Sequence, residues 1–210
     1  YERNFNEVQS DYVIVAPAFF LMSFDYRPMI DAHVKSGADV TIAYTHTTKA
    51  CDDYQNCDEI KIDEKGIVKT VIPYSGNKEE ADISLEVFIF NRKAFDGVVK
   101  MTKEVSNSYS LRRMVRYCCD GQIIKLNSYR FDGYVVPMLS LQDYVRHSFE
   151  LLNYSNRSKL FLEDWPIYTT THNTPPALYG PNSRGFNNAD QCNYCGQFPP
   201  NEVPSKLEGS

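Results

Sequence analysis

Cysteines, histidines and arginines are the residues of this chain whose types and spacing could do chemistry. Cys192 and Cys195 form a CxxC pair, an arrangement that binds zinc when a second such pair completes the four ligands. The remaining cysteines do not have that spacing, so we expect free thiols in the CxxC pair and at Cys51, Cys57, Cys118 and Cys119. The histidines are scattered, and neither a Ser/His/Asp nor a Cys/His arrangement can be argued for His33, His46, His147 and His172.

The sequence RRMVR, Arg112–Arg116, places three arginines within five residues. Guanidinium groups bind phosphates and carboxylates through paired N–H donors, so such a cluster could hold an anion. The segment has helical spacing, with Leu111, Met114, Val115 and Cys118 on its apolar face. Because arginines on the opposite face of such a helix are mostly solvated, we expect a solvated face here rather than an anion site.

A ligand site needs elements that position it, and the most apolar stretch of the chain, Asp11–Tyr26, is the first candidate. The β-branched run Val13–Val15, followed by Pro17, predicts a short strand buried on both faces, as in a parallel sheet. Ligands of open α/β sheets bind outside the carboxyl ends of such strands, so we expect any site over Ala16–Asp25. The tip of this segment, Phe19–Met22, contains no acid, base or glycine.

The following residues complete a strand–helix–strand unit. Apolar spacing over Tyr26–Ser36 predicts a helix that Gly37 ends, and Ala38–Tyr44 is a second β-branched run, so we expect two parallel strands. Downstream patterns predict a hairpin over 59–74, strands over 83–90, 122–126 and 130–138, and helices over 92–104, 109–119 and 140–152. Ser140 has the position of the N-cap of the last helix.

Composition limits the class of protein. The 210 residues are 42% hydrophobic, enough for a substantial core, and a net charge of −5 argues against a nucleic-acid partner or an acidic membrane surface. No apolar run approaches the roughly 20 residues that a bilayer span needs. The polar N-terminus carries no secretory signal, which predicts a cytoplasmic protein with reduced thiols, and the missing initial Met predicts a fragment.

Several segments resemble glucose-1-phosphate adenylyltransferases. FDYRPMIDAHVKSGADVTIAY (24–44) is similar to their "MDY…M…HxxxxADvTi" segment, and ISLEVFIF (83–90) to their "SMGIYVF" strand. GYVVPMLSLQDYVRHSFELLN (133–153) resembles "WRDVGTxxAYwxANxdLl". WPIYTTTHNTPPALYG (165–180) resembles the "WPIyTk…PPtkyg" lead-in to the C-terminal left-handed β-helix of the family.

The resemblance is strongest to the GlgD-type, non-catalytic subunit, which has Glu where catalytic subunits have the Gly of "SMG", here Glu86. It implies an α/β fold that is the second half of a Rossmann-like (GT-A type) nucleotidyltransferase domain, with a mixed, mostly parallel sheet, truncated before the β-helix. The implied partial domain spans 1–164, a linker spans 165–184, and 185–210 is expected to be a disordered or aberrant tail.

The family's chemistry, transfer of a nucleotidyl group from ATP to a sugar phosphate, needs a glycine-rich cradle, a Mg²⁺ clamp and a cation for the sugar phosphate. The resemblance implies that Phe19 and Pro137 stand at the two metal carboxylates, neither of which can bind Mg²⁺. Ile72 and Pro73 stand at the Glu and Lys of "FxEKP".

Other family positions are kept or changed without a clear chemical role. Asp58 replaces a glycine, and Ser84 is the one retained sugar-phosphate contact, a candidate substrate-binding residue. Asp25 is also retained, and we expect it to cap the following helix rather than to bind metal. The glycine-rich cradle has no counterpart within these 210 residues.

The sequence therefore predicts a non-catalytic, regulatory or structural GlgD-type subunit of glycogen synthesis. Its expected partner is a catalytic glucose-1-phosphate adenylyltransferase subunit in a hetero-oligomer, with neither nucleic acid nor membrane. We expect no cofactor in this chain, whereas active family members use Mg²⁺. Two alternatives stay open: an active enzyme making ADP-glucose with residues supplied by segments absent here, or a sugar-phosphate-binding module without catalysis.

Overall fold

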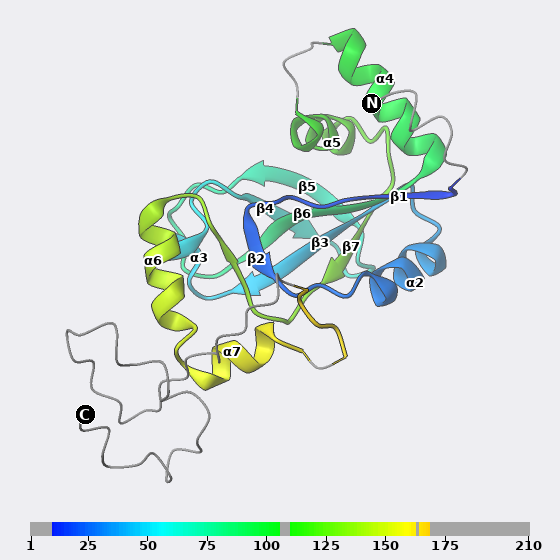
Figure 1. Cartoon of the computed structure of the whole chain (residues 1–210). Coiled ribbons are helices and arrows are strands. Elements are labelled where there is room, and N and C mark those ends of the chain that lie inside the picture. Colours follow the sequence, from blue (N-terminus) through cyan, green and yellow to red (C-terminus); the bar gives the residue numbers. More distant parts are fainter. Residues whose placement is uncertain (1–9, 106–109, 163, 169–210) are drawn as a thin grey trace, which may run out of the picture. The chain divides into compact units, whose positions relative to one another are not determined.

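The computed structural model describes residues 10–105, 110–162 and 164–168, and it divides into two compact units at Leu139/Ser140 (Figure 1). The first unit holds the strands β1 Tyr12–Val15, β2 Phe20–Met22, β3 Val40–Thr47, β4 Asp58–Ile62, β5 Val68–Pro73, β6 Ala81–Asn91, β7 Leu126–Arg130 and β8 Val135–Pro137. Its helices are α2 Tyr26–Ser36, α3 Ala50–Asp53, α4 Arg92–Val105 and α5 Leu111–Asp120. The second unit holds α6 Leu141–Glu150 and α7 Tyr154–Leu160.

The larger sheet has six strands, in the order β5-β4-β6-β3-β7, with β1 also paired to β6. The long strand β6 is its centre: β3 runs antiparallel along one edge, and β4 and β1 pair with its beginning and its end on the other. Among the described residues, β3 and β7 form the one parallel pair of this sheet. The α/β class with a mixed sheet is thus confirmed, whereas the expectation of a mostly parallel sheet is wrong.

The strand–helix–strand unit explains part of that error. β1 and β3 are both antiparallel to β6, so they run in the same direction, as the pattern predicts. They are not neighbours, however, because β6 lies between them. The local pattern fixes the direction of the two strands but does not reveal a third strand inserted from residues 81–91.

The first strand also differs from its prediction. β1 was expected to be buried on both faces, but Ile14 is 40% exposed and β1 pairs with the end of β6 alone. A β-branched run is typical of edge and central strands alike, so the residues of β1 do not distinguish the two positions.

A second, two-stranded sheet follows from the apolar tip of the first segment. β2 pairs antiparallel with β8, with Phe20 opposite Pro137 and Met22 opposite Val135. The strand expected over 130–138 is reduced to β8, Val135–Pro137, because Arg130 is the last residue of β7 and residues 131–134 lie outside both strands. A Cβ on Gly133 would lie 2.4 Å from Cζ of Phe131, so a larger residue at this position would require the Phe131 ring to move.

The strand expected over 122–126 begins only at Leu126, and the end of α5 gives the reason. Gln122 has a left-handed backbone (φ 53°), and Ile123 N donates to Cys118 O at 2.9 Å. This closing turn occupies the residues that the apolar pattern assigned to the strand.

The helices pack on both faces of the larger sheet. α4 and α5 lie on one side and α2 on the other (Figure 1). The core beside α4 and α5 consists of buried side chains that include Val40, Ile42, Phe88, Phe90, Val98 and Met114. The core beside α2 and the two-stranded sheet includes Phe20, Phe24, Met29, Ile83, Leu85 and Val135.

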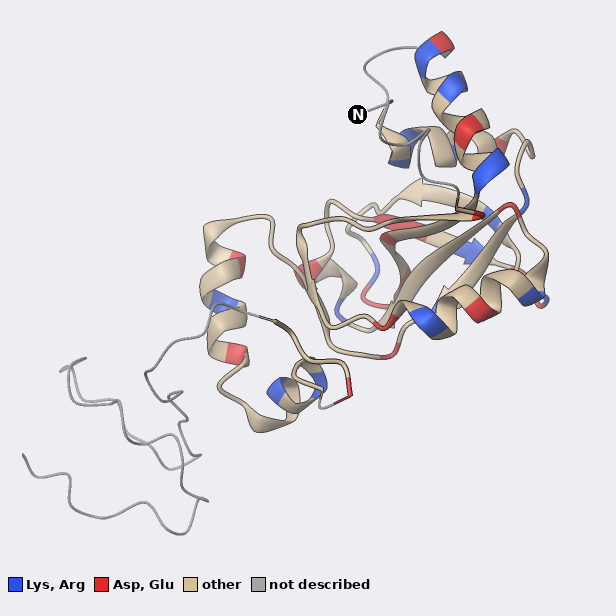
Figure 2. Ribbon diagram, turned by 45° about the vertical axis from the view of Figure 1, so that its right-hand side comes forward, with Lys and Arg blue, Asp and Glu red and all other residues tan. Residues whose placement is uncertain are grey.

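The helix ends agree with their sequence signals. Asp25 accepts a hydrogen bond from Arg27 N and caps α2, and Gly37 ends α2 with a left-handed backbone (φ 56°). Ser140 accepts a hydrogen bond from Asp143 N at the start of α6. Basic and acidic residues are interspersed along α2 and α4 rather than gathered by sign (Figure 2). Within the described ranges, none of the helices is both long and apolar enough to cross a membrane.

Candidate functional site

The structure brings together two of the positions singled out from the sequence, Phe19 and Pro137. Phe19 O accepts a hydrogen bond from Met138 N at 2.7 Å, and the next residue, Phe20, lies opposite Pro137 in the two-stranded sheet. The Phe19 ring packs 4.6 Å from that of Phe20, against the core beside α2. Phe19 and Pro137, which are 118 positions apart in the sequence, therefore lie near each other at one end of the two-stranded sheet.

The side chains at this place are hydrocarbon. Mg²⁺ is bound by oxygen ligands, and neither a phenyl ring nor a pyrrolidine ring offers one. Within the ranges that the structure describes, no three His, Cys, Asp or Glu side chains lie where they could hold a metal ion together. The residues present at this position thus do not fit a Mg²⁺ clamp.

Asp25 is the carboxylate nearest in sequence to this tip, and it is engaged elsewhere. Arg27 donates to both of its oxygens, with Nε–Oδ1 2.9 Å and Nη2–Oδ2 2.7 Å. These hydrogen bonds hold the pKa of Asp25 below its usual value, because they favour the charged form. The prediction that Asp25 caps the following helix is confirmed.

The other singled-out positions lie in the larger sheet. Ile72 and Pro73 are on β5, opposite Glu59 and Asp58 of β4. Ser84 is on β6 and is 1% exposed, and its hydroxyl oxygen accepts a hydrogen bond from Glu86 N at 3.1 Å. A substrate-binding role for Ser84, which its burial does not favour, stays a prediction.

Glu86 has an unusual backbone for its residue type. Its φ is 54°, in the left-handed region that glycine adopts readily and other residues rarely do. The β3–β6 register shifts here, between Ile42 and Tyr44 on the facing strand, so Glu86 lies in a β-bulge. The family resemblance places a glycine at this position, and the backbone of this chain still has the conformation that suits one.

We expect Glu86→Gly to be more stable than Glu86→Ala by about 1 kcal/mol, because only alanine is strained at a positive φ. Both variants remove the carboxylate, so the difference isolates the backbone. Urea unfolding monitored by circular dichroism measures it. Equal stabilities of the two variants would contradict the strained geometry.

A buried ionic cluster is the feature that sequence reasoning missed. Arg112 donates to both oxygens of Asp58, from Nε and Nη2, each at 2.7 Å, and Arg116 Nη2 donates to Oδ1 at 2.5 Å. Arg112 Nη1 lies 2.9 Å from Glu86 Oε1. The expectation that Arg112–Arg116 form a solvated face is thus wrong for Arg112 and Arg116, which are about one quarter exposed, at 27% and 24%.

The environment of the cluster perturbs its acids and bases. Burial raises the pKa of Glu86, with nearby Arg112 opposing the shift. The hydrogen bond to Asp58 raises the pKa of Arg112, which therefore stays charged. The spacing of four residues places Arg112 and Arg116 on the same side of a helix. This spacing was the one sequence signal that the two arginines share a partner.

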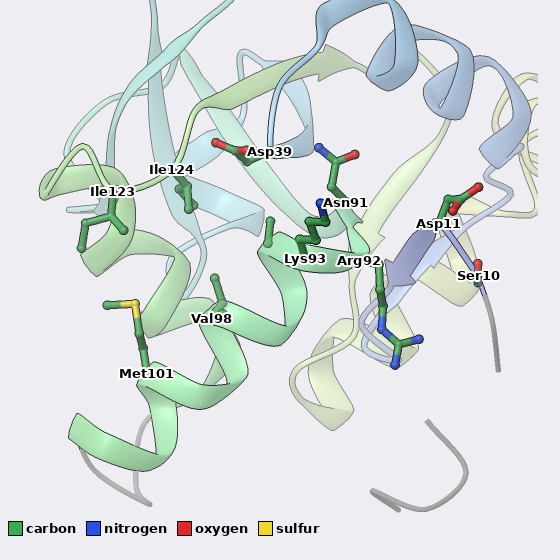
Figure 3. A pocket seen from close by; sticks show the side chains of 12 residues that line it. Ser10, Asp11, Asp39, Asn91, Arg92, Lys93, Val98, Met101, Ile123 and Ile124 are labelled. Atoms are coloured by element: carbon green, nitrogen blue, oxygen red, sulfur yellow. The ribbon is translucent and has the colours of Figure 1, made fainter. Parts of the chain in front are cut away.

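A wide cavity of about 880 Å³ lies at the start of α4 (Figure 3). One wall is apolar and includes Val98, Met101, Ile123 and Ile124, whereas Asp11 and Asp39 are among its polar residues. Arg92 at its rim is paired with Asp96 at 3.2 Å. Ser10, another of its polar residues, donates its hydroxyl to the backbone, to Tyr12 O at 2.8 Å.

The thiols that the structure describes are free, as the sequence predicts. Burial raises the pKa of Cys57 to about 12 and that of Cys119 to about 11, so both stay protonated at neutral pH. The CxxC pair, Cys192 and Cys195, lies outside the described residues, as does His172.

Comparison with known proteins relates the chain to one group of enzymes. No family model matches it. It is 24% identical over 178 residues to a glucose-1-phosphate adenylyltransferase of Lachnospira eligens, covering 79% of this chain and 38% of that protein. The protein of the same name from Bacillus subtilis is 23% identical over 172 residues, covering 81% of this chain and 45% of that protein. That from Bifidobacterium longum is 22% identical over 198 residues, with 82% and 46% covered.

Among solved structures, HddC from Yersinia pseudotuberculosis is similar with a TM-score of 0.49 and 12% identity, over 71% of this chain and 60% of that chain. The chain spans 38–46% of the length of the curated relatives named above. Those relatives align with about four fifths of its residues and bear one name. The chain is a distant relative of the glucose-1-phosphate adenylyltransferases.

Proposed function

We propose that this chain is part of a GlgD-type, non-catalytic subunit that acts as a regulatory or structural partner of a catalytic glucose-1-phosphate adenylyltransferase subunit in glycogen synthesis. In this proposal residues 1–164 form a nucleotidyltransferase-like partial domain, 165–184 a linker toward a β-helix, and 185–210 a tail.

The carrying observation is that Phe19 and Pro137 lie at the same end of the two-stranded sheet, where Phe19 O accepts a hydrogen bond from Met138 N and Phe20 lies opposite Pro137. Two carboxylates that clamp one Mg²⁺ must lie side by side, and the resemblance places the family's two metal carboxylates at these two residues. Their proximity supports the alignment independently of the motifs. The hydrocarbon side chains found there support the loss of the clamp.

Loss of the clamp has a large catalytic cost. Charge neutralisation by a metal contributes several kcal/mol to a phosphoryl-transfer transition state. A subunit without the metal clamp can still bind a homologous catalytic subunit through its surface. The apolar residues at the former metal position then contribute to the hydrophobic core.

The test uses the full-length protein with ATP, glucose 1-phosphate and Mg²⁺. We expect no ADP-glucose from the protein alone, and a change in rate or effector response when it is added to a catalytic subunit. Turnover by the protein alone would overturn the proposal.

A second arm identifies which subunit supplies the metal site. The catalytic partner is first inactivated by replacing its own metal carboxylates with alanine. We expect its mixture with this protein to stay inactive. Recovery of activity in that mixture would mean that this protein supplies a metal site, against the proposal.

A further inference from the structure

The cavity of about 880 Å³ at the start of α4 shares no lining residue with the two-stranded sheet (Figure 3). Its volume falls in the range of about 300–1,000 Å³ that is usual for ligand-binding cavities. We propose that this cavity binds a small apolar amine, whose primary ammonium group is held by Asp39 while its apolar body lies on the facing wall. The proposal does not rest on the proposed function.

Backbone hydrogen bonds of the larger sheet fix the polar side of the cavity. Asn91 N, at the end of β6, donates to Asp39 O at 2.9 Å. The next amide, Arg92 N, donates to Asp11 O at 2.8 Å. The two acidic residues precede β3 and β1, so they stand on either side of the junction between β6 and α4.

The opposite side of the cavity is an apolar wall. It is formed by Val98 and Met101 of α4 together with Ile123 and Ile124, which follow α5 (Figure 3). Ile123 is 50% exposed, although its backbone is held by the hydrogen bond from its N–H to Cys118 O. A ligand with an apolar body removes this fixed hydrocarbon surface from water, which favours binding.

Gly97 keeps the cavity open on the side of α4. It lies inside a 14-residue helix, where glycine is less favourable than any residue except proline. A Cβ at this position would have no atom within 4 Å, so the packing of the helix does not require a glycine. The missing side chain therefore leaves space that the ligand can occupy.

The carboxylate of Asp39 is positioned to accept a ligand cation. Lys125 N donates to its Oδ2 at 2.8 Å, which orients the half-buried group, and within the described ranges its Oδ1 has no partner. The ammonium group of Lys125 is directed elsewhere, because Nζ donates to Ser36 O at 3.1 Å. Asp39 N also donates to Lys125 O, so the carboxylate stands directly beside Ile124 and the apolar wall.

The charges of the other lining residues favour a cation over an anion. Arg92 is paired with Asp96. Lys93 and Asp11 are both exposed and carry opposite charges. The negative charge of Asp39 is thus left for the ligand to neutralise, and a primary ammonium group does so through charge-assisted hydrogen bonds.

The test is a calorimetric titration of the full-length protein with 2-phenylethylamine, with 2-phenylethanol as a neutral analogue of the same shape. We expect the amine to bind at one site with a Kd of about one millimolar or tighter. The alcohol should bind at least about tenfold more weakly, the effect of losing one charge-assisted hydrogen bond. Equal binding of alcohol and amine would overturn the proposal.

A third arm, L-phenylalanine, distinguishes two sources of the same chemistry. Binding tighter than that of 2-phenylethylamine would assign the site to apolar amino acids, with Lys93 as the partner of the carboxylate. Weaker binding would assign it to free amines. Absence of binding by both compounds at about ten-millimolar concentration would overturn the proposal.

The location is tested by Gly97→Leu, which fills the cavity from α4. We expect the variant to weaken amine binding at least about tenfold while it keeps the fold, because leucine favours the helix and its Cβ meets no neighbour. Gly97→Ala adds one methyl group at the same position and should leave binding within about threefold. Unchanged binding by a folded Gly97→Leu protein would place the ligand elsewhere and overturn the site.

The ionic contact is tested by Asp39→Asn, whose amide oxygen can still accept the hydrogen bond from Lys125 N. We expect amine binding to weaken about tenfold and binding of the alcohol to stay the same. Asp31→Asn on α2 removes the same charge from an exposed position and should leave binding within about twofold. Equal effects of the two variants would show a general influence of charge and would overturn the site.

Discussion

Asp58→Ala is expected to lower the free energy of unfolding by about 3 kcal/mol, the lower end of the range for removing one partner of a buried ion pair. The carboxylate is 1% exposed and holds both Arg112 and Arg116. Its loss leaves two guanidinium groups that are three-quarters buried and close to each other without their shared counter-ion. Glu86 offsets only part of this, because it contacts Arg112 alone. Urea unfolding measures the change.

The matched control for that experiment is Asp132→Ala. Asp132 also accepts a hydrogen bond from an arginine, Arg130 Nε at 2.7 Å, but its side chain is 71% exposed. Exposed pairs of this kind contribute about 0–1 kcal/mol, so we expect a small change. Equal losses for Asp58→Ala and Asp132→Ala would mean that the buried cluster gives no more stability than a surface pair.

Phe90→Ala is the second large effect, with an expected loss of about 3–5 kcal/mol of unfolding free energy. Phe90 is completely buried at the end of β6, where it faces Val13 of β1 on one side and Val40 of β3 on the other. Its ring packs edge-to-face against the ring of Phe95 of α4, with the ring centroids 5.5 Å apart. Removing the ring therefore leaves a cavity at the junction of three elements.

Chemical denaturation with a fluorescence readout tests this prediction, and Tyr117→Ala on α5 is the control. Tyr117 is 49% exposed, so its truncation removes an aromatic ring without opening an enclosed cavity. We expect the control to lose less than about 1 kcal/mol. A loss of that size for Phe90→Ala would show that the β1–β6–α4 junction collapses around the missing ring.

Local signals in the sequence were sufficient for the helix ends. Asp25, Gly37 and Ser140 act on backbone groups within three residues of themselves, so their effect does not depend on the rest of the fold. The hairpin of β4 and β5 is predictable for the same reason, since its strands are joined by a short turn.

Strand neighbours were not predictable in that way. β6 separates β1 from β3 although it comes some seventy residues after the one and forty after the other in the numbering, and no local pattern announces that insertion. The exposure of Ile14 has the same non-local cause. β1 pairs only with the end of β6, so it lies at the margin of the sheet.

In the candidate sites, too, residue types could be read from the sequence but long-range contacts could not. The sequence shows that Phe19 and Pro137 are apolar, but their proximity depends on the pairing of β2 with β8. Arg112 and Arg116 appear as a surface face because their partner, Asp58, is 54 and 58 positions away. Side-chain pairs at such separations become visible only when the fold is known.

The arginine cluster also fixes how α5 sits on the sheet. Arg112 and Arg116 are one helical turn apart, and both reach the same carboxylate of β4. A rotation of α5 about its axis would pull at least one guanidinium group away from Asp58. A slide by four residues, about 6 Å along the axis, would instead bring one arginine to the place of the other. The helix thus has a defined rotational setting, together with one alternative axial setting in each direction that keeps a guanidinium group on Asp58.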